Sequence, residues 1–244
     1  MDNKKTDKIV SAFILMGMAA SIIIASIIQL QGGSVSAEKL ILTSVGALCG
    51  VISTVLAANA SILNFVFGLL DVSIYSIVLW DNAMWSQFAL HALYFLPMQF
   101  VGFFLWRKKG ASASKKVKTE RLSRKGWGIT AAAVAAVFIA SGWLSYFIGK
   151  GAGEVQAAGK TCLDAGITTM NIVALVLMSK AYVEQWYLWV GVNVLSITIW
   201  LLNLSESPAN SYTVVLFIKY VFYLLNSINA IRIWLRLSKA EKSS

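Results

Sequence analysis

The chain has 244 residues, of which 58% are apolar and only 13% are charged. Because soluble domains carry roughly 25% charged residues, this composition excludes an ordinary soluble protein and predicts an all-α integral membrane protein with several crossings. The formal net charge of +10 lies mostly in loops and tails, where it indicates membrane topology rather than nucleic-acid binding.

Residue types that support catalysis or metal binding are scarce. Cys49 lies inside an apolar run and Cys162 at the start of another, so a disulfide framework is not expected. The single histidine, His91, cannot form a metal site alone, and no P-loop motif is present. We therefore expect no enzymatic activity, no catalytic residue, no metal and no cofactor.

Eight apolar segments reach the length of about 20 residues that a helix needs to cross a bilayer. In chain order they are residues 9–29, 38–57, 62–80, 83–106, 127–149, 161–180, 184–204 and 210–236.

Lysine and arginine residues gather in three regions that eight crossings place on one side of the membrane. These are the N-terminal residues 1–8, the loop 107–125 and the tail 236–242. Since positively charged loops remain in the cytoplasm, we expect both termini there. We interpret the loop 107–125 as a cytoplasmic linker, with a lipid-headgroup or regulatory role as the alternative.

Two groups of three segments share a layout, which predicts an internal repeat. YFLPMQFVGFFLW, from the first group, aligns without gaps to FYLLNSINAIRIW, from the second, and this pairs Trp106 with Trp234. Three crossings reverse the side of the chain, so two repeats in the same orientation need one crossing between them. The fifth segment supplies it. Parallel repeats of this kind place a solute site between them near the membrane midplane.

The predicted architecture is therefore two parallel three-helix repeats joined by a linker helix (3+1+3), plus one extra N-terminal transmembrane helix. It divides the chain into a tail and extra helix (1–37), a first repeat (38–106), a basic loop and linker helix (107–160), a second repeat (161–236) and a cytoplasmic tail (237–244).

The segment 184–204 carries two indoles and a carboxamide on one helical face. Trp186, Trp189 and Asn193 are spaced i, i+3 and i+7, and Asn193 lies roughly 14 Å along the helix, near the midplane. A polar group there is costly unless it finds a partner or faces a cavity, so we expect all three residues to contact a solute. The alternatives are an interfacial position for Trp186 or Trp189 and an interhelical hydrogen bond for Asn193.

Segment 62–80 carries a second polar stripe, and Asp71 is the only acid deep in any span. A carboxylate at a helix centre costs about 2.5–3.5 kcal/mol on insertion scales, so we expect it to contact solute or to pair with Lys219, the only base deep in a span. One register of this segment against 184–204 pairs Asp71 with Asn193. The stripe consists of Asn64, Gly68, Asp71 and Tyr75.

Carboxamide and phenol groups from the last segments of both repeats complete the candidate site. Gln99 and Tyr94 lie in the first repeat, and Asn226 and Asn229 in the second. Each is either a solute contact or a residue that holds helices together.

Two sequence motifs occur within this layout, with Asn226 in the last span. One is W-x-x-W-x-x-x-N, formed by Trp186, Trp189 and Asn193, and the other is G-x-x-D-x-x-x-Y, formed by Gly68, Asp71 and Tyr75. Together they resemble the bacterial PnuC family of vitamin transporters, typified by nicotinamide riboside uptake, over roughly residues 38–236. The resemblance implies a fold related to the SWEET sugar transporters, a place in the bacterial inner membrane, and facilitated diffusion by alternating access. It also implies that a cytoplasmic kinase traps the solute by phosphorylation.

Nicotinamide riboside matches the chemistry of the candidate residues. Carboxamides offer both donors and acceptors, which suit ribose hydroxyls and an amide, and indole faces attract a pyridinium cation. Thiamine or riboflavin as the solute, or a non-transport structural role, are the alternatives. Expected partners are the vitamin and membrane lipid, with no nucleic acid, and a homo-oligomer is compatible with the sequence.

Overall fold

The computed structural model describes residues 3–32, 37–81, 85–151, 158–206 and 211–240, and these residues contain no β-strand, which confirms the all-α class. The elements are α1 (Asn3–Gln31), α2 (Ala37–Ala58), α3 (Asn64–Asp81), α4 (Trp85–Leu90), the π-helical turn η1 (His91–Phe95), α5 (Leu96–Lys108), α6 (Arg124–Gly151), α7 (Ala158–Ser179), α8 (Gln185–Glu206) and α9 (Ser211–Ala240).

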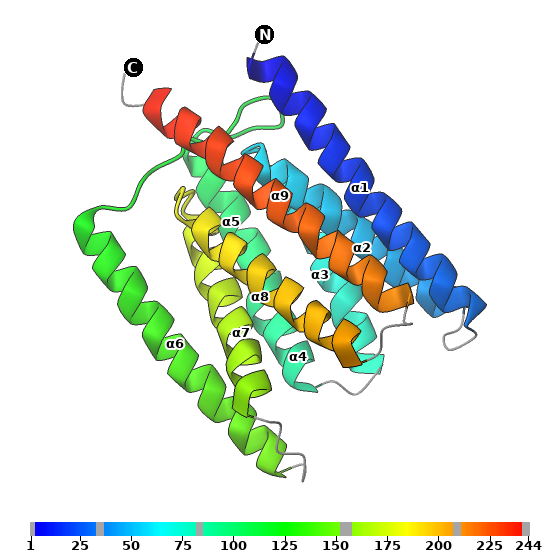
Figure 1. Ribbon diagram of the computed structural model, residues 1–244. Helices are drawn as coiled ribbons and strands as arrows, with labels where there is room; N and C mark the ends of the chain where they lie inside the picture. The colour runs from blue at the N-terminus through cyan, green and yellow to red at the C-terminus, as the bar shows by residue number, and fades with distance from the viewer. Residues whose placement is uncertain (1–2, 33–36, 82–84, 152–157, 207–210, 241–244) are drawn as a thin grey trace.

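Seven helical runs of the described chain are long and apolar enough to cross a membrane. They match the first seven predicted segments, and the fourth is the continuous run from α4 through η1 to α5. Helical spans are expected because a backbone in lipid must satisfy its own hydrogen bonds. The eighth segment, α9, is a 30-residue helix that lies along α1 and α8 (Figure 1), so we retain it as a crossing.

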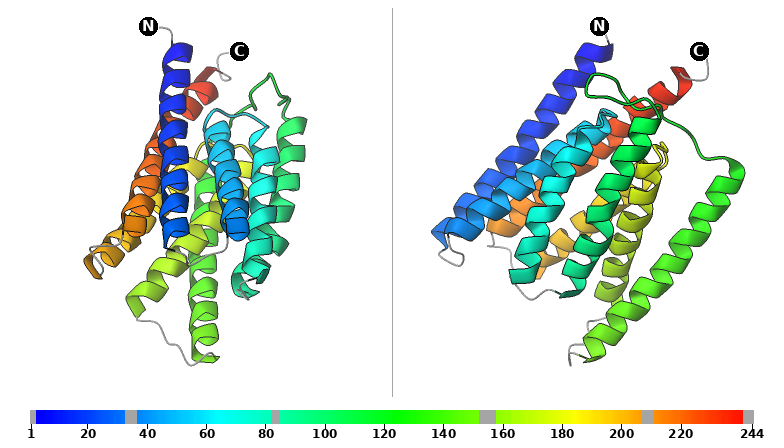
Figure 2. Two further views of the ribbon diagram at one scale, coloured as in Figure 1. Left: turned by 90° about the vertical axis from the view of Figure 1, so that its right-hand side faces the viewer. Right: turned by 180° about the vertical axis from the view of Figure 1, so that it is seen from behind.

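The three basic regions lie at one end of the helix bundle, as the charge pattern predicts. The start of α1, the end of α9 and the loop from α5 to α6 are all found there (Figure 1). We call this the inner end and the opposite one the outer end. The linker helix α6 packs mainly against α7 and stands apart from the rest of the bundle (Figure 2).

Two corners at the inner end have the same backbone geometry. Ala60 joins α2 to α3 with a φ of 57°, and Ala181 joins α7 to α8 with a φ of 58°. A left-handed residue just after a helix is a common helix end, although glycine usually occupies it. When the two predicted repeats are aligned so that Ala60 matches Ala181, Asp71 matches Val192. The alignment considered from the sequence, which matches Asp71 with Asn193, is therefore wrong by one residue. The matching corners support the predicted parallel repeats.

Two buried tryptophans connect the two predicted repeats in equivalent ways. The Trp106 indole N–H of α5 donates to the Met178 carbonyl of α7 over 2.8 Å. The Trp234 N–H of α9 donates to the Ala57 carbonyl of α2 over 3.1 Å. Each acceptor lies three residues before its left-handed alanine, and the two indole centroids are 5.7 Å apart. The last helix of each predicted repeat thus donates a second hydrogen bond to an end carbonyl of the first helix in the other, beside the one from the left-handed alanine N–H. The contacts agree with the ungapped pairing of Trp106 with Trp234.

The basic loop is fixed to the inner end rather than extended into solvent. The Val117 N–H donates to the Ala60 carbonyl, and the Glu120 N–H donates to the Ala181 carbonyl. The buried Glu184 carboxylate accepts hydrogen bonds from the Leu122 N–H and the Arg121 Nε–H. The predicted linker is therefore an ordered strap, residues 109–123, that joins both corners.

The fourth crossing contains a π-helical turn immediately before Pro97. The Leu96 N–H bonds to the His91 carbonyl, one residue further back than in an α-helix. Proline disturbs the turn that precedes it because it lacks an N–H and its ring crowds that turn, and π-turns are frequent at functional sites. Here the turn places His91 and Phe95 on a side pocket beside the central cavity described next.

Candidate solute-binding site

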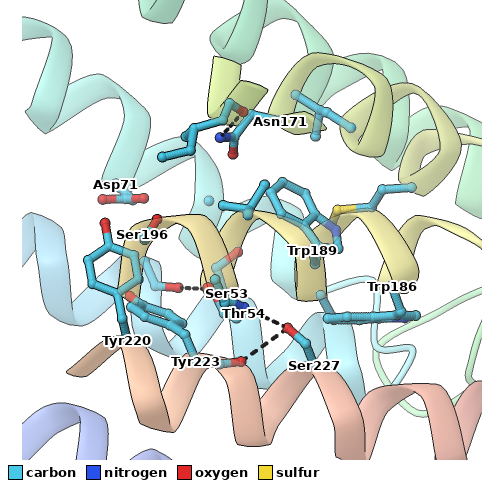
Figure 3. A pocket seen from close by; sticks show the side chains of 18 of the residues that line it. Ser53, Thr54, Asp71, Asn171, Trp186, Trp189, Ser196, Tyr220, Tyr223 and Ser227 are labelled. Carbon is cyan, nitrogen blue, oxygen red and sulfur yellow. Dashed lines mark hydrogen bonds between the residues drawn. The ribbon is translucent and has the colours of Figure 1, made fainter. Parts of the chain in front are cut away.

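A cavity of about 410 Å³ lies among α2, α3, α5, α7, α8 and α9, between the two predicted repeats. Figure 3 shows its side chains converging from these helices. Its polar and aromatic lining residues are Ser53, Thr54, Asp71, Gln99, Asn171, Trp186, Trp189, Asn193, Ser196, Lys219, Tyr220, Tyr223 and Ser227.

The α8 stripe contributes all three of its predicted residues to this cavity. Trp186 is buried toward the inner end, and its indole N–H has no hydrogen-bond partner among the described residues. Trp189 lies one turn further along the helix (Figure 3). Asn193 lies one turn beyond Trp189. The Asn193 side-chain amide donates to the Ser227 hydroxyl over 3.0 Å, and that hydroxyl donates to the Tyr223 carbonyl. These contacts fix the Asn193 carboxamide at the cavity wall.

Helices α3 and α5, from the first predicted repeat, place a carboxamide and a carboxylate on the facing wall. The Gln99 amide lies against the α3 backbone, where a Cβ at Gly68 would be 2.5 Å from its Oε1. Asp71 also lines the cavity, and so does Lys219. Among the described residues, no ion pair joins Asp71 to Lys219. The ion pair considered from the sequence is therefore absent from this conformation.

Five of the predicted site residues lie elsewhere. Tyr75 lines the outer and side pockets, not the central cavity. The Tyr94 hydroxyl donates to the Ile172 carbonyl of α7. Asn64 begins α3 and donates to the Ser61 carbonyl. Asn226 donates to the Thr54 carbonyl, and Asn229 accepts from Arg232. The last four contacts fit the alternative in which such residues hold the backbone or neighbouring side chains in place.

Several lining residues were missed in the sequence. Tyr220, Tyr223 and Ser227 on α9 are spaced i, i+3 and i+7, the same spacing as the α8 stripe, and all three line the cavity. Phenols and hydroxyls are common in apolar segments, so they indicate a binding site less clearly than an isolated carboxamide does. The repeated spacing is nevertheless a signal that could have identified these three residues. Asn171 on α7 is a further lining carboxamide that was not singled out.

A second cavity of about 620 Å³ lies on the outer side of the first, and we call it the outer vestibule. It extends to Lys39 and Asp81 at the outer ends of α2 and α3. No group of three or more metal-ligating side chains occurs among the residues that the structure describes. The arrangement offers aromatic faces and carboxamides at mid-helix depth, which suit binding of a flat, polar solute.

Comparison with known proteins identifies a family. Residues 40–236 match the model of the nicotinamide mononucleotide transporter family. The chain is 32% identical to the nicotinamide riboside transporter PnuC of Neisseria mucosa, over 81% of this chain and 73% of that one. The corresponding protein of Haemophilus influenzae is also 32% identical, over 81% and 80%. A crystal structure of the vitamin B3 transporter PnuC superposes with a TM-score of 0.65 and 28% identity, covering 93% of this chain and 92% of that one.

Proposed function

Because the chain belongs to the nicotinamide mononucleotide transporter family, whose curated relatives are PnuC proteins, we propose that its solute is nicotinamide riboside. The chain is a multi-pass membrane transporter and not an enzyme. The family model and the relatives name different solutes, a mononucleotide and a riboside, so the assignment of cargo depends on the site.

The proposal rests on one observation: Trp186, Trp189 and Asn193 line the same cavity as Gln99. The indoles bind the pyridinium ring by stacking and cation–π attraction. The carboxamides of Asn193 and Gln99 exchange hydrogen bonds with the ribose hydroxyls and the nicotinamide amide.

The proposed transport mode is facilitated diffusion, in which the two repeats alternately expose the cavity to the outer and inner sides. Such a carrier only equilibrates its solute, so net uptake requires a cytoplasmic step that consumes it, and phosphorylation by a kinase has that effect. The grouping of basic regions at the inner end supports a cytoplasmic position for that end in a bacterium, because positively charged loops remain in the cytoplasm.

Isothermal titration of the detergent-purified protein tests the solute. Nicotinamide riboside, its mononucleotide, thiamine and riboflavin are titrated in parallel. We expect micromolar or tighter binding of the riboside, with the others at least ten times weaker, since each mismatched polar group left unpaired costs about 1–3 kcal/mol. Folded protein that released no heat with the riboside would refute the assignment, and tight binding of another of the four would replace it.

Replacing Gly68 with alanine is expected to weaken riboside binding about fivefold to tenfold, roughly the value of one hydrogen bond. The added Cβ would lie 2.5 Å from Gln99 Oε1 and would displace the carboxamide from its position against α3. Gly128→Ala is the matched control, because a Cβ there meets nothing within 4 Å. Equal dissociation constants for Gly68→Ala and wild type would show that Gln99 does not contribute to solute binding.

A further inference from the structure

The two large cavities follow one another along the bundle and meet at a shared ring of residues. Gly50, Asp71, Lys219, Tyr220 and Tyr223 line both the outer vestibule and the central cavity. We call these five residues the neck. A solute that enters from the outer end must pass the neck before it reaches Trp189 and Asn193.

The neck holds an acid and a base from different predicted repeats. Asp71 belongs to α3 of the first repeat, and Lys219 belongs to α9 of the second. The Lys219 ammonium lies 5.2 Å from the centre of the Tyr220 ring and 5.9 Å from that of Tyr223. The two charges face cavities, where water can solvate them, and do not form an ion pair with each other. Closing the neck would remove that water, and the charges would then need each other.

The inner end of this conformation is closed. Trp106, Trp186 and Trp234 are at most 2% exposed and form one packed cluster below the cavity. The strap residues Val117 and Glu120 bond to the corners of both repeats over the same end. The described path therefore leads from the outer end to the cavity, with the neck as its narrow point.

We propose that the neck is the outer gate of the transporter and that it closes by forming the Asp71–Lys219 ion pair when the inner end opens. This inference rests on the proposed transport function and extends it. In the outward conformation described here the pair is separated. In the inward conformation it joins the two repeats across the path, and the phenols of Tyr220 and Tyr223 fill the remaining space.

Gly50 positions the acid of the gate. A Cβ at this residue would lie 2.7 Å from Asp71 Oδ2 and 2.8 Å from its Cγ, so the carboxylate lies directly against the α2 backbone. Any side chain at this position must push the carboxylate away from it. Gly50→Ala therefore disturbs the gate while keeping both charges.

The test measures how often the central cavity opens to each side. A single reporter, Ser196→Cys, is placed in the central cavity (Figure 3) in a background with Cys49→Ser and Cys162→Ser. A membrane-impermeant thiol reagent is applied to oriented vesicles from the outer or the inner side. Without the closing ion pair the transporter favours the outward conformation. Asp71→Asn combined with Lys219→Met should therefore raise the ratio of outer to inner labelling about tenfold, because one of the two conformations loses a favourable contact.

Two further variants make the result specific. Exchanging the charges, Asp71→Lys with Lys219→Asp, restores a pair and should return the ratio to within about threefold of wild type. Gly50→Ala should shift the ratio in the opposite direction, because its Cβ clashes with the Asp71 carboxylate in the outward conformation described here. Thr43→Cys in the outer vestibule and Ser112→Cys in the strap report the outer and inner sides alone, and their rates should not change.

The proposed gate would be refuted if the neutral double variant kept the wild-type ratio of outer to inner labelling while the Thr43→Cys and Ser112→Cys labelling rates also stayed unchanged. The labelling requires no solute, so its outcome is independent of the cargo. Wild-type protein that gave the expected ratios but neither bound nor transported nicotinamide riboside would refute the proposed solute and leave the gate in place.

Discussion

Replacing Trp189 with alanine is expected to weaken nicotinamide riboside binding roughly 30-fold. A desolvated cation–π contact with an indole is worth about 2 kcal/mol, and each 1.4 kcal/mol changes a dissociation constant about tenfold. Trp189 lines both the central cavity and the side pocket bounded by the π-helical turn, so its ring is the most accessible aromatic face of the α8 stripe. Titration calorimetry of the purified variant gives the change directly.

Two controls separate ring contact from general loss of structure. Trp143 is 60% exposed on α6 and stacks on Phe147, outside the cavity, so Trp143→Ala should bind the riboside as wild type does. Trp189→Phe retains a smaller ring and should lose less than Trp189→Ala. A Trp189→Ala protein with the wild-type dissociation constant would exclude this indole from the site.

Replacing Trp234 with alanine is expected to lower the free energy of unfolding by roughly 3–5 kcal/mol, the range for deleting a large buried aromatic side chain. Its side chain is fully buried, contacts the rings of Trp106 and Trp186, and donates its N–H to the Ala57 carbonyl. The substitution leaves a cavity where the two predicted repeats meet and removes one of the two hydrogen bonds that the Ala57 carbonyl accepts, the other coming from the Ala60 N–H. Equilibrium unfolding in mixed micelles of mild detergent and dodecyl sulfate measures the change.

The loss of unfolding free energy in Trp234→Ala should divide into a packing part and a hydrogen-bonding part. Trp234→Phe keeps a ring but loses the N–H, and about 1–3 kcal/mol of the loss should remain, from the lost hydrogen bond together with the smaller ring. Trp143→Ala, on the exposed side of α6, should stay within about 0.5 kcal/mol of wild type. A change below about 1 kcal/mol in Trp234→Ala would contradict the account of how the repeats are joined.

The helices were predictable because a crossing segment leaves a strong hydropathy signal. The corners at Ala60 and Ala181 were not, since each depends on one φ angle at a residue type that rarely adopts it. The strap was also beyond prediction. Its contacts to the two corners use backbone N–H groups of Val117 and Glu120, which every non-proline residue has, while its lysines and serines suggest an unstructured linker.

The site was predictable where a polar group stood alone in an apolar segment. Asn193 and Gln99 are such groups, and both line the cavity. Asn226 is another, but it lies one residue from Ser227, and one residue turns the side chain about 100° around the helix. Ser227 therefore faces the cavity while Asn226 bonds to the Thr54 carbonyl of α2. Which of two adjacent polar residues faces a cavity is decided by helix packing, which one sequence does not reveal.

Uptake of labelled nicotinamide riboside into proteoliposomes distinguishes a passive carrier from an ion-coupled pump and from a protein that transports nothing. The purified protein is reconstituted without any enzyme, and uptake is followed with and without imposed proton and sodium gradients. We expect saturable uptake that stops when the internal concentration equals the external one, that neither gradient changes, and that is reduced in the Trp189→Ala variant. Accumulation above the external concentration, or uptake no faster than in protein-free liposomes, would contradict this expectation.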